Sequence, residues 1–135
     1  MNALPSCGHV CNVHATPPTL VKADPDLLAA ALMNLLDNAV RHGAHQISVV
    51  VRANARQQLI FLHDDGPGIS AEKRQALQKA LKAQDYENSQ LGLGLMLADM
   101  VARAHGGSLR IVPALSGFAI LIRLGPSRTE VLSIK

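Results

Sequence analysis

The sequence NLLDNAVRH at residues 34–42 determines how this chain is interpreted, together with DDGPGI at residues 64–69 and LGLGL at residues 91–95. The first stretch places two carboxamides, Asn34 and Asn38, one turn apart on a predicted helix, so their side chains share a face. The second ends an apolar strand in a carboxylate and two glycines. The third is a glycine-rich start of a helix. Together, in this order, the three stretches predict a nucleotide site.

Around the two asparagines, Arg41 and His42 lie within one turn of the same helix face. A magnesium ion that keeps several waters and bridges phosphates needs few protein ligands, so a single asparagine oxygen is enough to bind it. An arginine beside it is suited to contact phosphate directly. The alternative for this stretch alone is a set of ordinary polar residues on a solvated helix surface.

The second stretch places Asp64 at a strand end, followed by Gly66, Gly68 and Ile69. A carboxylate there accepts a hydrogen bond from the amino group of adenine, and glycines let a ring approach the backbone closely. Asp65 is interpreted as the solvated neighbour. The alternative is a plain turn, because Asp-Gly and Pro-Gly pairs are common turn sequences.

The third stretch is predicted to bind phosphate through backbone N–H groups at a helix start. Its members are Gly92, Leu93, Gly94 and Leu95. It lacks the Gly-Lys-Ser/Thr ending of a Walker loop, and it does not follow a strand as the dinucleotide fingerprint requires. Both of those folds are therefore disfavoured.

Patterning along the chain predicts one domain at residues 10–125, with tails at 1–9 and 126–135. The expected elements are two brief strands or one edge strand within 10–22, a helix over 24–41, strands near 47–52 and 59–64, a helix capped by Ser70, a helix over 94–105, and a hairpin of 108–112 with 118–124. The last helix is expected to be amphipathic, with Leu97, Val101 and Ala104 on its apolar side. The polar stretch 82–90 is predicted to be a mobile loop over the site.

Composition limits the class of protein. Of 135 residues, 48% are hydrophobic but only 2% aromatic, so aliphatic side chains must fill the core. The apolar runs are too short for a membrane span, and two cysteines without a second pair or a His cluster fit a cytoplasmic setting. The net charge of +3 comes from scattered basic residues without aromatic neighbours, which argues against nucleic-acid binding.

In order and spacing, the three stretches resemble the N, G1 and G2 boxes of the ATP-binding domain shared by sensor histidine kinases, type II topoisomerases, Hsp90 and MutL. The amino-acid sequences of the three stretches are most similar to those of the kinases. The sequence AHGG at residues 104–107 adds to this resemblance, which covers residues 21–124. The resemblance implies a Bergerat-type α+β fold, a two-layer sandwich. One face of a mixed, mostly antiparallel sheet of about five strands would be covered by about three helices.

The resemblance also implies roles for individual residues. Asn38 corresponds to the magnesium ligand with Asn34 as its helper, Arg41 and its neighbour His42 to phosphate contacts, and Asp64 to the adenine-binding residue. The close-approach positions implied in this way are Gly66, Gly68, Gly92 and Gly94, with Ile69, Leu93 and Leu95 completing the ATP-binding set. The cofactors are then ATP and Mg²⁺.

As a histidine-kinase catalytic domain, the chain would transfer the ATP γ-phosphate to a His on a separate dimerisation domain of the same full-length protein. The implied further partner is a response regulator, and the full-length protein could be anchored in the inner membrane, with no membrane contact by this domain. ATP-hydrolysing relatives have Glu in place of Asn34, and a carboxamide cannot act as their general base. Transfer rather than hydrolysis is therefore expected, with no turnover by this chain alone.

Two other functions remain open at this stage. A stand-alone serine kinase of the anti-sigma-factor type would share the fold, and His42-Gly43 is similar to that family, although Asn34 argues against it. A degenerate binding module is the other. Its support is the absence of Phe from residues 69–91, where the only aromatic residue is Tyr86, and the sequence GFAI at 117–120, where Ala119 replaces the threonine of the kinase motif.

Overall fold

The computed structural model describes residues 2–6, 9–15, 21–54, 56–88 and 91–125. In these ranges the strands are β1 (Asn2–Ser6), β2 (His9–Ala15), β3 (Gln46–Ala53), β4 (Gln58–Asp64), β5 (Ser108–Val112) and β6 (Phe118–Leu124), and the helices are α1 (Pro25–Arg41), α2 (Ala71–Lys82) and α3 (Leu93–Ala104). The expected tail at 126–135 lies outside the described residues.

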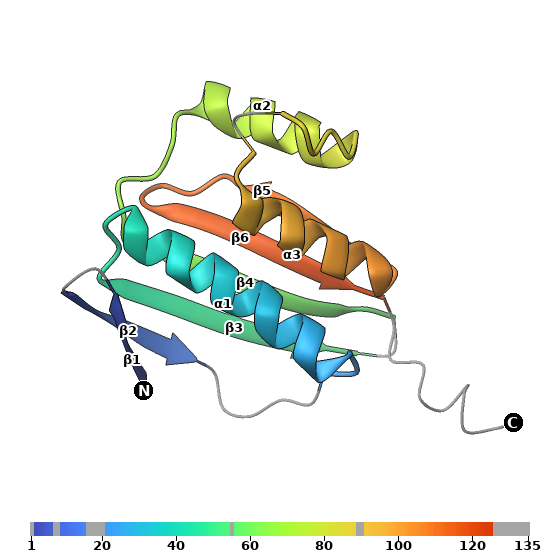
Figure 1. Ribbon diagram of the computed structural model, residues 1–135, viewed down its shortest axis with the longest axis horizontal. Helices are drawn as coiled ribbons and strands as arrows, with labels where there is room; N and C mark the ends of the chain where they lie inside the picture. The colour runs from blue at the N-terminus through green and yellow to red at the C-terminus, as the bar shows by residue number, and fades with distance from the viewer. Residues whose placement is uncertain (1, 7–8, 16–20, 55, 89–90, 126–135) are drawn as a thin grey trace, which may run out of the picture.

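The strands form one six-stranded sheet in the order β1-β2-β3-β4-β6-β5, and α1, α2 and α3 lie on one side of it (Figure 1). Strands β2 and β3 are parallel, whereas the other neighbours are antiparallel. The predicted two-layer α+β architecture is confirmed, with six strands where about five were expected.

The additional strand lies in the segment expected to be a tail. Strand β1 pairs with β2 from Asn2↔Val13 to Ser6↔His9. The short sequence of β1, which contains a proline, has no clear alternation, so its extended form depends on backbone pairing with β2. Strand β2 covers the first part of residues 10–22, for which two brief strands or one edge strand were expected, and residues 16–20 lie outside the described residues.

Helix α1 begins and ends where its sequence predicts. The Asp24 side chain accepts hydrogen bonds from the N–H groups of Asp26 and Leu27, at 3.0 and 3.1 Å, and Pro25 occupies the first turn. The helix ends at His42, and Gly43 follows with φ +93°, a conformation that favours glycine. These caps fix the position of the Asn34–Asn38 turn over the sheet.

The buried face of α3 differs from the prediction. Its buried residues are Leu95, Ala98, Asp99 and Ala102, rather than the expected set of Leu97, Val101 and Ala104. The helix is rotated because an aspartate lies on its inner face, and a search for apolar periodicity treats aspartate as a surface residue.

Strand β4 alternates between the two faces of the sheet. Ile60, Leu62 and Asp64 are buried beneath the helices, whereas Phe61 and His63 are only half-buried on the opposite side. The helix-covered face leads into the main aliphatic core, in which Leu81, Leu109 and other branched side chains pack. Asp64 is therefore directed to the layer between sheet and helices, beside the end of α1.

Candidate functional site

A cleft of ≈ 240 Å³ opens where the ends of α1 and β4 meet the starts of α2 and α3. Its lining residues are Asn38, Ala39, His42, Asp64, Pro67, Gly68, Ile69, Lys73, Leu77, Gly92, Leu95 and Phe118. The three sequence stretches, which are spread over residues 34–95, thus contribute to one cavity.

Most of the predicted site residues line this cleft, and some do not. Those that do are Asn38, His42, Asp64, Gly68, Ile69, Gly92 and Leu95; those outside its lining are Asn34, Arg41, Gly66, Leu93 and Gly94. The nucleotide roles of all of them stay predictions.

Asp64 is the buried carboxylate of the cleft, with 8% of its surface exposed. Its Oδ1 accepts a hydrogen bond from the Gly66 N–H at 2.8 Å. Burial is the largest effect on the pKa of Asp64 and raises it, while the backbone N–H groups of Gly66 and Phe118 oppose that shift. The charged form of a carboxylate buried in this way is stabilised by any further hydrogen-bond donor that enters the cleft.

The neighbouring Asp65 has a structural contact set. Its Oδ1 accepts from the N–H groups of His45 and Gln46, at 2.7 and 2.9 Å. These backbone donors, Gln46 first, lower the pKa of Asp65. Asp65 is exposed, as expected, and it fastens the turn after α1 to the end of β4.

On α1, the two asparagines differ. Asn34 Nδ2 donates to the Ala30 carbonyl at 2.7 Å, so this carboxamide is directed along the helix. Asn38 lines the cleft, and within the described part of the chain its carboxamide has no hydrogen-bond partner. His42 Nδ1 lies 2.8 Å from the backbone carbonyl oxygen of Asn38. Because a carbonyl oxygen only accepts, Nδ1 is the ring nitrogen that carries the proton in this contact. Asn38 thus offers a free, neutral oxygen to the cavity.

Arg41 is directed elsewhere. Its Nε lies 3.0 Å from Asp37 Oδ2, and both side chains are largely exposed, at 67% and 43%. An exposed pair of this kind is weak, so the guanidinium remains available to an anion at little cost.

The glycines have distinct surroundings. A Cβ on Gly117 would lie 1.9 Å from the Asp64 carbonyl oxygen, and one on Gly68 would lie 2.6 Å from the Gly117 oxygen. These two glycines let the start of β6 pack closely against the end of β4 and the loop that follows it. Gly94 faces Asn34, whose carbonyl oxygen would be 3.4 Å from a Cβ, so it brings α3 close to α1. Gly92 borders open space, with no atom within 4 Å.

Sequence reasoning missed several lining residues, chiefly Lys73, Leu77 and Phe118. Lys73 and Leu77 are four residues apart, which places them on one face of α2, but nothing local indicates that this face borders the cleft. On β6, Phe118 lines the cleft whereas Ala119 does not. Among residues 117–120, the one that lines this cleft is therefore Phe118, and not Ala119, which replaces the threonine of the kinase motif.

The expected loop at 82–90 is anchored where it is described. The Asp85 N–H donates to Ala80 at 2.8 Å, and the Tyr86 hydroxyl donates to Asp99 at 2.6 Å. Leu91, the next described residue, is 2% exposed and packs in the core. Residues 89–90 lie outside the described residues.

The described residues include no group of three or more His, Cys, Asp or Glu placed to hold a metal. Among the described helices, none is long and apolar enough to cross a membrane.

Comparison with known proteins identifies the family. The family described as histidine kinase-, DNA gyrase B- and HSP90-like ATPases matches residues 23–129, and the chain belongs to it. Within that family it is a catalytic ATP-binding domain of the sensor histidine kinase type, and the serine-kinase alternative is not favoured.

Similar proteins are sensor kinases. The sensor protein kinase CarS of Pseudomonas aeruginosa is 33% identical over 112 residues, covering 82% of this chain and 25% of CarS. Sensor histidine kinase CpxA of Escherichia coli is 30% identical over 112 residues, covering 79% of this chain and 24% of CpxA. The chain thus spans about a quarter of these relatives.

Among solved structures, the ATP binding domain of PrrB from Mycobacterium tuberculosis superposes with a TM-score of 0.68 at 25% identity, covering 86% of this chain and 80% of that one. The mycobacterial sensor histidine kinase MprB gives 0.59 at 30% identity, covering 85% and 80%. Both the fold and the family type are thus those of sensor-kinase ATP-binding domains.

Proposed function

We propose that this domain binds ATP with Mg²⁺ in the cleft and transfers the γ-phosphate to a histidine on a separate dimerisation domain of the full-length protein. The observation that supports this most is the convergence of Asn38, Asp64 and Gly92 on one cavity. We further propose that a response regulator receives the phosphoryl group, and that the domain works in the cytoplasm as part of a protein anchored in the inner membrane.

Asp64 would bind the adenine. A buried carboxylate accepts a hydrogen bond from the exocyclic amino group, and the apolar side chains of Ile69, Leu77 and Phe118 around the same cleft suit an aromatic base. Asp64 already accepts from the Gly66 N–H, so its orientation is fixed before any ligand enters.

The other end of the cleft would bind the phosphates and the metal. Gly92 is the N-cap of α3 and has no side chain to cap the helix, so first-turn N–H groups remain available to phosphate oxygens. The free oxygen of Asn38 fits Mg²⁺, which accepts few protein ligands when phosphates supply others. The bound ion would neutralise charge on the transferred group. Lys73 is a further cation on the cleft wall.

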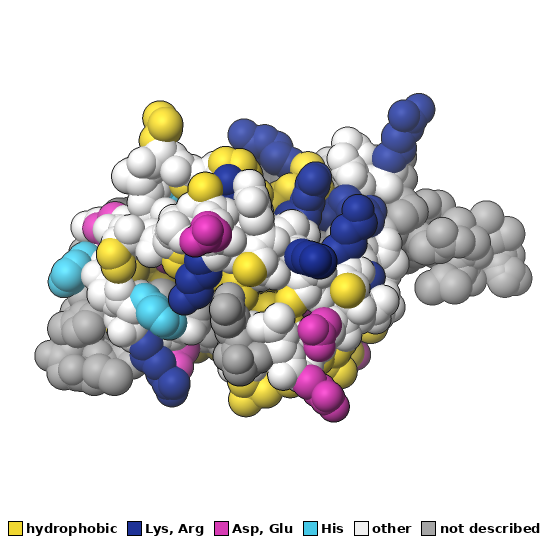
Figure 2. Space-filling model, turned by 90° about the horizontal axis from the view of Figure 1, so that it is seen from above, with side chains coloured by type: hydrophobic (Ala, Val, Ile, Leu, Met, Phe, Trp, Pro, Cys, Tyr) yellow, Lys and Arg dark blue, Asp and Glu magenta, His cyan; other side chains and the backbone are white. Residues whose placement is uncertain are grey.

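Charge on the surrounding surface supports an anionic ligand. Helix α2 contains four basic residues and one acidic one: Lys73, Arg74, Lys79, Lys82 and Glu72. Figure 2, which looks down on the molecule from the top of Figure 1, shows Lys and Arg side chains gathered on one part of this face. Such a patch raises the encounter rate with a polyanion such as ATP, and this gain decreases with salt.

The experiment that tests the proposal compares Asn38→Ala with Arg41→Ala by calorimetry, with and without magnesium. Asn38→Ala is expected to remove most of the magnesium dependence of ATP binding, because the metal loses its protein oxygen. Arg41→Ala is expected to weaken ATP about threefold even without the ion, since an exposed cation contributes little. Wild-type affinities for both variants under both conditions would contradict these assignments, and absence of any ATP binding by the wild type would contradict the function.

A second test concerns Gly92. Gly92→Ala should cost at most about 1 kcal/mol of stability, because its Cβ would meet no atom within 4 Å and only the N-cap preference for glycine is lost, yet the methyl group would occupy cleft space. ADP affinity is expected to fall about tenfold, or about 1.4 kcal/mol. Gly107→Ala is the contrasting control, since its Cβ would lie 1.6 Å from the Arg123 oxygen and should destabilise the fold. Thermal unfolding and ADP titration of both variants separate the two effects, and an unaltered ADP affinity in Gly92→Ala would exclude phosphate from this corner.

A further inference from the structure

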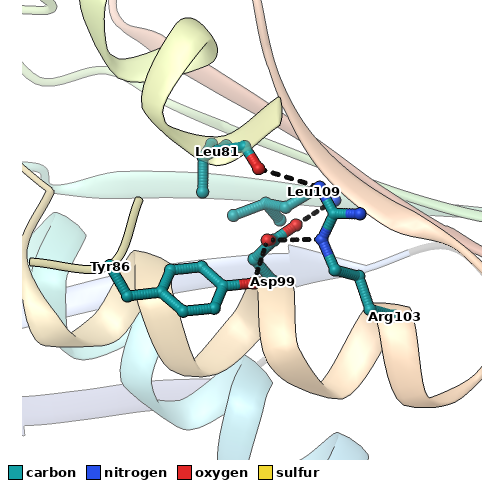
Figure 3. Close-up of polar contacts among 5 residues, drawn as sticks. All are labelled: Leu81, Tyr86, Asp99, Arg103 and Leu109. Atoms are coloured by element: carbon teal, nitrogen blue, oxygen red, sulfur yellow. Dashed lines mark hydrogen bonds and ion pairs between the residues drawn. The ribbon is translucent and has the colours of Figure 1, made fainter. Parts of the chain in front are cut away.

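A carboxylate that lies outside the cleft joins several elements around it. Asp99 of α3 is 0% exposed, and its Oδ1 accepts from the Leu109 N–H at the start of β5, at 2.9 Å. Its Oδ2 accepts from the Tyr86 hydroxyl at 2.6 Å and from Arg103 Nε at 2.9 Å (Figure 3). A buried charge is tolerated only when it is paired and hydrogen-bonded in this way.

Arg103 extends the network to α2. Its Nη2 donates to the Leu81 carbonyl, in the last turn of α2, at 2.8 Å. The side chains of Asp99 and Arg103 thus hold together four parts of the chain. These are the end of α2, Tyr86 in the connection to α3, α3 itself and β5. Partners of this kind are directional, whereas apolar packing alone would leave the connection free to shift.

Tyr86 lies within the connection between two helices that both line the cleft. Helix α2 contributes Lys73 and Leu77 to the cavity, and α3 contributes Leu95 together with its N-cap Gly92. Leu95 is one turn before Asp99 on the same face of α3, so the network continues directly from the cleft wall. Any change in the position of the α3 start is therefore transmitted to the residue that binds the Tyr86 hydroxyl.

We propose that Tyr86, held by Asp99, is a positioning residue that fixes the start of α3 for the phosphate groups of a bound nucleotide. This inference rests on the proposed function of the cleft. Binding free energies are reciprocal, so a nucleotide that depends on the Tyr86–Asp99 contact must also strengthen that contact. Adenosine, which lacks phosphates, should be indifferent to it.

The chain contains an internal reporter for this coupling. It has one tyrosine and no tryptophan, so the tyrosine emission of the protein comes from Tyr86 alone. A phenol that donates to a carboxylate is quenched, and a stronger contact is quenched further. ADP titrated into the wild-type chain is expected to lower this emission, with the same Kd that calorimetry gives. Adenosine should leave it unchanged at saturation.

The variant that tests the role is Tyr86→Phe, which keeps the ring and removes only the hydroxyl. Its ADP affinity should fall about 3- to 10-fold while adenosine affinity stays within about twofold, the range of effects expected for residues that modulate coupling. Asp85→Asn is the matched control, because that carboxylate is exposed and adjacent, and its ADP affinity should equal that of the wild type. Arg103→Lys, which keeps the charge, should restore part of the loss seen in Arg103→Ala.

The possible outcomes distinguish a failure of the positioning role of Tyr86 from a failure of nucleotide binding in the cleft. Wild-type ADP binding with unchanged Tyr86 emission, or with full affinity in Tyr86→Phe, would overturn the positioning role and leave the nucleotide site intact. Equal losses for ADP and adenosine would also overturn it, since that is the signature of general destabilisation. A wild-type chain that binds neither ligand would overturn both.

Discussion

Asp64→Asn is expected to stabilise the ligand-free chain and to weaken ADP binding about 10- to 100-fold, which corresponds to a loss of about 1–3 kcal/mol. Burial raises the pKa of Asp64, so the ionised carboxylate is costly in the folded state. Asparagine keeps an acceptor for the Gly66 N–H but has no charge to bury. It also has one oxygen fewer, and its amide nitrogen would meet the amino group of adenine with a second donor.

The stability gain has a defined pH dependence. A carboxyl whose pKa is raised on folding contributes stability that is present below its unfolded pKa, near 3.8, and is lost as pH rises through the folded pKa. The wild type therefore loses stability with rising pH where the variant does not. Urea unfolding at neutral pH should give Asp64→Asn a free energy of unfolding about 0.5–2 kcal/mol higher than that of the wild type, a usual gain when a destabilising functional group is replaced. This difference in the free energy of unfolding should disappear as the pH falls toward 4.

Asp65→Asn provides the matched control with the opposite sign. The pKa of Asp65 is lowered by the N–H groups of Gln46 and His45, so its stability contribution is present above 3.8 and is lost as pH falls through the lower folded value. This variant should be less stable than the wild type at neutral pH, with ADP affinity nearly unchanged. If both asparagine variants lost stability equally, burial of Asp64 would not be the dominant effect on its charge.

The parts of the fold that the sequence predicted are those with local causes. Asp24 caps α1 with its own side chain, and Ser70 caps α2 by accepting from the Lys73 N–H at 3.1 Å. The hairpin of β5 and β6 falls where a turn sequence separates two apolar runs. Helix caps and hairpin turns involve residues within a few positions of each other, so their chemistry is visible in sequence.

The parts that were missed depend on distant partners. Strand β1 is extended because β2 pairs with it, and α3 is rotated because Tyr86, Arg103 and Leu109 satisfy a buried Asp99. None of these partners could be assigned from periodicity, because an isolated aspartate in a helix is normally exposed.

The candidate site shows the same division. Asn38 and Asp64 could be selected because each has chemistry that suits a nucleotide and stands at the end of a regular element. Helical spacing alone could not separate Asn34 from Asn38, since the difference arises from one bond to the Ala30 carbonyl. Lys73 and Phe118 reach the cleft only through the packing of α2 and the register of β6, in which Phe118 is opposite Asp64.

Incubation of the chain with γ-labelled ATP is expected to give no label on the chain and no steady phosphate release, while addition of its His-bearing domain should give label on that partner. Catalysis in such a reaction comes mainly from positioning and from electrostatic stabilisation, which Asn38, Arg41 and the α3 start would supply. The label should be acid-labile and base-stable, as expected for a phosphorylated histidine. Asp64→Asn should reduce it in proportion to its lost nucleotide affinity.

The absence of hydrolysis follows from the cleft itself. Among its described lining residues the only carboxylate is Asp64, which we assign to the adenine, and hydrolysis needs a base beside the attacking water. Asn34 cannot accept a proton, and its carboxamide is bonded along the helix. The one imidazole among the described lining residues is that of His42, whose Nδ1 donates to the backbone carbonyl of Asn38, so Nε2 is the ring nitrogen left to face an attacking water. Phosphate release by the isolated chain that is lost in His42→Ala would therefore make this domain an ATPase, whereas release that survives this substitution points to a contaminating activity.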